Sequence, residues 1–435
     1  MQTWCRCLAA FISAMGIGAL SYAQSSVSIE KELFITDLAV VNHAAEAQNE
    51  NGAFHIRTLL DAMAPTGKDA KDVVLSLLGS FRDSANPDLP MRLIDERVIN
   101  PWKRWPPGAT APNPATDPLP TDQAWNVNWR QAPFRLLAIV NRIDLRHNPN
   151  IGNAGEGRFV FGVTDAITGD ALLFTVILEY IQPAQSEAEV RKVAADWHAL
   201  GSFSAFNDAY VDRLKIVTRR FAGRNAAPTR LNASAIGQIR TNEIALNPSG
   251  GAGWELREFV LAEPDRLFHP ATVKLTPHHS LNNTAALAFL LRRLSPDVSE
   301  ALPAELFDFR AITDANPDFQ WQAPGFDPAG AVLRRFSVNT CSGCHGGDAK
   351  TAPATPFLQV APRPANQPAV LAKFLTGTGT VAVVDPGTGR SVSNFSDLEL
   401  RKLGFELLLD LPFPTAAPLL RTLRSDERGR SIRVH

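Results

Sequence analysis

FRLLAIVNRIDL (134–145), RFVFGV (158–163) and LLFTVILEYI (172–181) are the stretches that decide the fold class. They are short, hydrophobic and rich in β-branched and aromatic residues, and Gly, Asn and Asp lie between them. This pattern is typical of strands joined by turns. The segment Gly155–Arg158 is interpreted as a tight glycine turn between two of these strands. Further strands are expected at 238–246 and 254–261.

Two amphipathic helices separate the strand groups. The first begins at a capping box formed by Ser186 and Glu189, and its apolar stripe ends before Gly201. The second repeats apolar residues every three or four positions over 206–221. Strands, a helix pair and more strands predict an α+β fold with an antiparallel sheet and packed helices, and this domain is assigned to 125–300.

The segments on either side of this domain are predicted to be mainly helical. In the N-terminal region, 24–103, apolar periodicity marks helices within 52–64 and 72–78. The proline-rich segment 104–124 is interpreted as a linker or a wrapped loop, and the tryptophans around it are expected to pin it to a core. The C-terminal region, 301–435, is predicted to be a helical, haem-binding, cytochrome c-like segment with a helix closing near Leu411.

Residues 1–23 resemble a secretory signal. Arg6 and the terminal amine precede an apolar run from Leu8 to Leu20, and small residues precede a cleavage site expected after Ala23. The run is too short to span a bilayer comfortably, and no later run reaches spanning length. We therefore expect a periplasmic or secreted protein without a transmembrane segment after cleavage.

The composition narrows the class of partner. The 435-residue chain has 43 basic and 44 acidic side chains, a net charge of −1. This balance argues against a general nucleic-acid binder and against a polybasic protein of the membrane surface. A chain of this length buries enough apolar surface to fold without disulfides.

Removal of the signal also removes Cys5 and Cys7 and leaves two cysteines, in the sequence Cys341-Ser342-Gly343-Cys344-His345. This sequence matches the attachment pattern of c-type haem. Positions i, i+3 and i+4 share one face of a helical turn, so two thiols reach the vinyl groups while the imidazole reaches the iron. We expect Asn339 or Thr340 to cap this turn, Gly346-Gly347 to end it, and Ser342 and Gly343 to leave room for the porphyrin edge.

Two other interpretations of the cysteine pair stay open. A CxxC disulfide of the thioredoxin type usually opens a helix inside a βαβ unit, and no such unit precedes Cys341. A structural zinc site needs more ligands than two cysteines supply, and no HxxxH spacing is present. The motif therefore favours one covalent haem c, with Cys341 and Cys344 as thioether anchors and His345 as the proximal ligand.

The motif and its flanks carry a resemblance to a known group. RFSVNTCSGCHGGDAKT (335–351), PFLQVAPR (356–363) and LAKFLTGTGTVAVVDPGTGR (371–390) resemble an uncharacterised family of secreted bacterial proteins with a single CxxCH motif. APFRLLAIVNRIDLR (132–146) and AGEGRFVFGV (154–163) extend the resemblance upstream. It implies a bacterial source and a cytochrome c-like haem segment. Some members carry a histidine at the position of Gln359.

The sequence leaves the second axial ligand of the iron open. No methionine follows His345, so a methionine ligand would have to come from upstream. The candidates are Met63, Met91, His278 and His279, and the alternative use of each is core packing or an exposed loop position.

The open ligand position leaves three classes of function. The first is a mono-haem c-type protein that transfers single electrons to an unidentified partner protein. The second is a haem enzyme or a sensor of gas or peroxide with an open distal site. The third is a secreted binding or structural protein that carries only a disulfide.

Overall fold

A computed structural model describes residues 25–82, 94–110, 116–146, 153–243, 254–273, 277–294, 310–312, 321–345, 358–378, 383–384, 391–392 and 395–410. An eight-stranded antiparallel sheet forms its centre, and seven strands follow one another in chain order. They are β1 (Phe34–Ile35), β2 (Phe134–Arg142), β3 (Asn153–Thr164), β4 (Ala171–Pro183), β5 (Ile236–Glu243), β6 (Glu255–Ala262) and β7 (Leu267–Ala271). Strand β8 (Arg310–Ile312) pairs with β6 beside β7.

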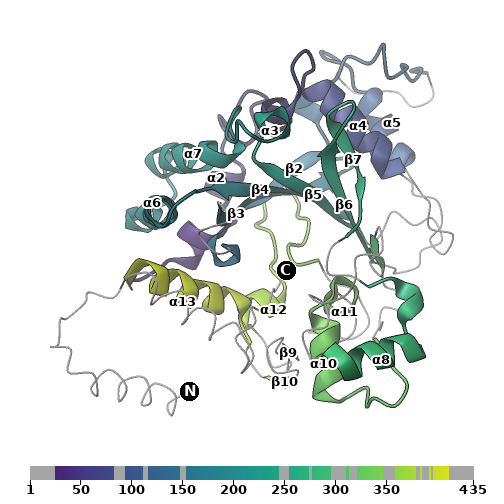
Figure 1. The fold of residues 1–435 in the computed structure, drawn as a ribbon. Helices are drawn as coiled ribbons and strands as arrows, with labels where there is room; N and C mark the ends of the chain where they lie inside the picture. Colours follow the sequence, from purple (N-terminus) through teal and green to yellow (C-terminus); the bar gives the residue numbers. More distant parts are fainter. Residues whose placement is uncertain are drawn as a thin grey trace.

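The first face of the sheet is covered by helices (Figure 1). Side chains of alternate strand positions, such as Ile139, Phe159 and Leu178, share one apolar core with these helices. The helices are α2 (Leu38–Val41), α3 (Ile56–Met63), α4 (Ala70–Arg82), α5 (Asn100–Lys103), α6 (Glu187–His198) and α7 (Asp208–Ala222), with helical turns at Ile29–Leu33 (η1) and Asp95–Ile99 (η2). Figure 1 shows α3, α4 and α7 above the sheet.

The second face of the sheet is also buried. Val140, Val160 and Phe34 pack there against a segment from Val360 to Leu375 and against Leu398. The segment contains α12 (Lys373–Thr376), and Leu398 lies on α13 (Asp397–Asp410). Burial on both faces explains why the central strands read as nearly continuous apolar runs.

A smaller helical group lies at the β6–β8 end of the sheet (Figure 1). It consists of α8 (Ala285–Leu294), α10 (Ala331–Val338) and α11 (Cys341–His345). Leu287, Leu291, Trp321 and Phe336 form its own apolar cluster. The short strands β9 (Val383–Val384) and β10 (Ser391–Val392) pair with each other.

The predicted α+β class with an antiparallel sheet is confirmed. Ser186 and Ser396 cap α6 and α13 by accepting hydrogen bonds from the N–H groups of Glu189 and Glu399, as their spacing predicts. The expected cytochrome c-like helical segment at 301–435 is not seen in the part of it that the structure describes. There, α10 and α11 pack together near β8, while α13 packs against α6 and η1.

The prediction of a glycine turn at Gly155–Arg158 was wrong, because these residues lie inside β3. Gly155 has φ +91° at an irregularity in the β3–β4 register, and a side chain there would meet the Arg142 carbonyl at 2.3 Å. The glycine is needed for a bend within a strand. The tryptophans near the proline-rich segment pack as expected, since Trp102, Trp125 and Trp129 are buried and in edge contact.

The contact between β3 and α7 predicts the effect of one substitution. Gly157→Ala is expected to lower the free energy of unfolding by about 1–3 kcal/mol, because its Cβ would lie 2.3 Å from the buried ring of Phe221. That ring is held between Phe159, Tyr180 and Trp197. Urea unfolding measures the change.

Gly79→Ala is the matched control for this substitution. Gly79 is an exposed position on α4 with open space around it, so alanine there is expected to add about 0.5–1 kcal/mol of helix stability. Equal effects of the two substitutions would contradict the packing described for β3 and α7.

Candidate functional site

The CxxCH motif forms a single helical turn, α11, as its spacing predicts. Thr340 caps this turn: its hydroxyl accepts from the Gly343 N–H at 3.1 Å and from Trp321 Nε1 at 2.9 Å, and donates to the Ser337 carbonyl at 2.8 Å. Thr340 therefore fixes α11 against the end of α10. Gly346-Gly347, expected to end the turn, lie outside the described residues.

Gly343 has a different role from the one expected. Its missing side chain was expected to leave room for a porphyrin edge. A Cβ on Gly343 would lie 2.2 Å from both the carbonyl and the hydroxyl oxygen of Ser337. Gly343 thus allows α10 and α11 to approach closely.

All three motif side chains are buried, Cys341 and Cys344 to 1% exposure and His345 to 2%. Cys341 packs with Trp254, Leu256, Val273 and Leu358. Cys344 instead belongs to the apolar cluster on the second face of the sheet, with residues such as Val140, Val160 and Val360. The turn therefore joins two apolar clusters, and the structure records the cysteines as separate thiols.

The imidazole of His345 lies flat against the indole of Trp254. The ring centroids are 4.2 Å apart and the planes differ by 9°. Trp254 is fully buried immediately before β6, and its Nε1 donates to Asn242 Oδ1 on β5 at 3.0 Å. Stacking fixes the plane of the imidazole and leaves the edge of the ring, which carries the nitrogen lone pair, clear of the indole face.

A row of buried ion pairs crosses the second face of the sheet, the face against which Cys344 packs. Arg158 lies 3.1 Å from Glu179, and Arg240 lies 3.0 Å from Glu258 and 3.8 Å from Glu179. Burial opposes ionisation of Glu179, but Arg158 and Arg240 outweigh it and hold the pKa of this carboxyl below its ordinary value.

This row reaches the motif through Arg240. Burial opposes the charge of Arg240, but Glu179, Glu258 and Cys341 together raise its pKa above the ordinary value. Cys341 is therefore within electrostatic reach of a buried guanidinium.

Two hollows adjoin the second face of the sheet. A cavity of about 30 Å³, the size of one water molecule, lies between Val140, Arg158, Asn242 and Val360. Phe34 lines this cavity and also an open groove of about 510 Å³ on its other side. The groove lies beside β1, at the opposite edge of the sheet from β6, and none of the residues that line it belongs to the motif.

The structure separates the candidates for the second iron ligand. Met63 lies in the helix-covered core on the first face, whereas Cys344 packs on the second face. His278 is exposed and its Nδ1 contacts the Ser280 hydroxyl at 2.6 Å. Met91 and the side chain of His279 lie outside the described residues. The structure does not bring Met63 to the motif.

Sequence reasoning missed Trp254, Asn242 and Arg240 as neighbours of the motif. All three lie on or beside predicted strands, but their distance from Cys341 along the chain is about 90 residues or more. Only the register of β5 and β6 places them together: Asn242 pairs with Leu256, and Arg240 with Glu258.

Comparison of the chain with protein-family models, with curated proteins and with solved structures finds no match. Within the described ranges, no group of three or more His, Cys, Asp or Glu residues is arranged to hold a metal ion. No described helix combines the length and apolar character that crossing a membrane requires.

Thiol reactivity tests two points: whether Cys341 and Cys344 are buried, and whether they are free thiols or a disulfide. In a haem-free chain that lacks residues 1–23, Cys341 and Cys344 are expected to react with a chromogenic thiol reagent only after unfolding, because each is 1% exposed. An added cysteine at the exposed position Ala205 (Ala205→Cys) should react at once in the folded protein. If unfolding without a reductant releases no thiol, the pair forms a disulfide and this description is wrong.

Proposed function

We propose that this chain carries one haem c, bound through Cys341 and Cys344 with His345 as the proximal ligand, and that it transfers single electrons. The arrangement of α11 supports this most directly: both thiols and the imidazole lie on one capped turn, and Trp254 holds the imidazole plane. The α+β sheet, in place of a small helical cytochrome domain, then supplies part of the haem surroundings.

The donor set fits this group chemically. Each thiol adds across one vinyl group: the sulfur forms a bond to carbon, and its hydrogen moves to the neighbouring vinyl carbon, so no oxidant is required. The cavity of about 30 Å³ is much smaller than a porphyrin, so binding would require Leu358 and Val360, which share apolar clusters with the two cysteines, to move. When bound, haem supplies a one-electron iron couple.

The surroundings of the motif bear on the reduction potential. Burial of the motif disfavours additional positive charge. The oxidised iron carries one more positive charge than the reduced iron, so burial favours the reduced state and raises the potential. We expect Trp254 to act as a positioning residue that keeps the proximal imidazole from rotating.

Attachment of haem is tested by Cys344→Ala in a bacterial host with a c-type haem maturation system. This variant retains at most one thioether, so covalent haem on a denaturing gel is expected to fall strongly compared with the unchanged chain. Ser342→Ala is the matched control, since it alters a small buried side chain of the same turn without removing a thiol. Unchanged haem in Cys344→Ala, or no haem in the parent chain, would refute the attachment.

The alternative of an open distal site requires a separate measurement. An electron carrier with two axial ligands gives a low-spin reduced spectrum that carbon monoxide does not change. A shift on addition of carbon monoxide would instead assign the protein to the class of haem enzymes or ligand sensors. The spectrum of the reduced, haem-loaded protein separates these classes without knowledge of the partner.

A further inference from the structure

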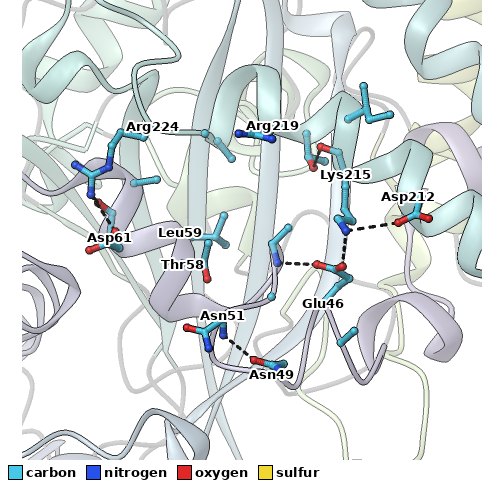
Figure 2. Close-up of a pocket in the computed structure, with 18 residues that line it drawn as sticks. Glu46, Asn49, Asn51, Thr58, Leu59, Asp61, Asp212, Lys215, Arg219 and Arg224 are labelled. Atoms are coloured by element: carbon cyan, nitrogen blue, oxygen red, sulfur yellow. Dashed lines mark hydrogen bonds and ion pairs between the residues drawn. The ribbon is translucent and has the colours of Figure 1, made fainter.

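A second groove, of about 750 Å³, lies on the outer side of the helices that cover the first face of the sheet (Figure 2). One wall is a stripe along α7, from Asp212 through Lys215 and Arg219 to Gly223. The other wall is the loop around Asn49–Asn51 together with α3. The groove is separate from the motif, which lies beyond the opposite face of the sheet.

Two ion pairs hold the walls together. Lys215 Nζ lies 2.5 Å from Glu46 Oε1, and Arg224 lies 2.9 Å from Asp61 Oδ2. Partial burial opposes ionisation of Glu46, but the Ala53 N–H and Lys215 outweigh it and keep the pKa of Glu46 below its ordinary value. The charges of Glu46 and Asp61 are therefore already matched by Lys215 and Arg224.

Arg219 lies between these two ion pairs on α7, with Thr58 and Leu59 across the groove (Figure 2). No acceptor of its guanidinium is found among the described residues. The side-chain N–H groups of Asn49 and Asn51 likewise have no described acceptor, and both residues line the groove. The groove thus offers three sets of hydrogen-bond donors, one of them cationic.

Small residues form part of the groove lining: Gly52, Ala53, Ala62, Ala222 and Gly223. Ile216, which is 54% exposed, supplies apolar surface beside Arg219, whereas Leu59 is almost fully buried.

We propose that this groove binds a small organic carboxylate. The carboxylate pairs with Arg219 in the bidentate geometry that a guanidinium favours, and the apolar body lies on Ile216. A volume of about 750 Å³ is within the range of small-molecule sites. The Asn49 and Asn51 amides donate to further oxygen atoms of such a ligand.

Benzoate combines a carboxylate with an apolar ring and serves as the probe. Calorimetric titration of the chain from residue 24 onward measures its binding. Benzoate is expected to bind, and Arg219→Ala is expected to weaken binding about tenfold or more, because a charge-assisted hydrogen bond is lost. Ile216→Ser should weaken it as well. Benzyl alcohol, which lacks the carboxylate, and inorganic phosphate, which lacks the apolar body, are expected to bind more weakly.

Arg220→Ala is the matched control, since Arg220 is the next residue on α7 and pairs with Asp196, away from this groove. It should leave benzoate binding unchanged. Equal weakening by Arg219→Ala and Arg220→Ala, phosphate binding as tight as benzoate binding, or no benzoate binding at millimolar concentration would each overturn the proposal.

Discussion

The row of buried ion pairs on the second face of the sheet is the constraint on which the rest of the structure depends. Arg158, Glu179, Arg240 and Glu258 lie on four neighbouring strands, and each charge needs its partner because an unpaired buried charge costs several kcal/mol. A shift of one residue in any strand would move its charge to the apolar first face. The ion pairs therefore specify the register of β3 to β6.

This register determines where the CxxCH turn lies. With β5 and β6 aligned, Asn242 holds Trp254, and Trp254 stacks on His345. The turn is thus attached to the sheet by its imidazole and to α10 by Thr340. A motif held from both sides is ordered before any cofactor binds, which reduces the conformational entropy lost on binding.

The sequence predicted local features well and long-range ones poorly. Strand character at 134–145, the Ser186 cap and the helical turn at 341–345 depend on neighbours within a few residues. The positions of Trp254 and Arg240 near the motif depend on contacts between residues about 90 to 100 positions apart in the chain, which periodicity does not encode. Gly155 was misassigned because glycine with positive φ suits both a turn and a strand irregularity. Strand β1 has two residues, too few for a recognisable pattern.

The proposed function depends on Cys341 and Cys344 together carrying one haem. The pyridine haemochrome spectrum of the purified protein, unfolded in alkali after expression with a maturation system, tests it most directly. Its main reduced band depends on how many vinyl groups the protein has converted to thioethers. We expect one haem per chain, with the band position of a haem whose two vinyl groups are both saturated. A spectrum without haem, or haem extracted into acidic organic solvent with both vinyl groups intact, would contradict it.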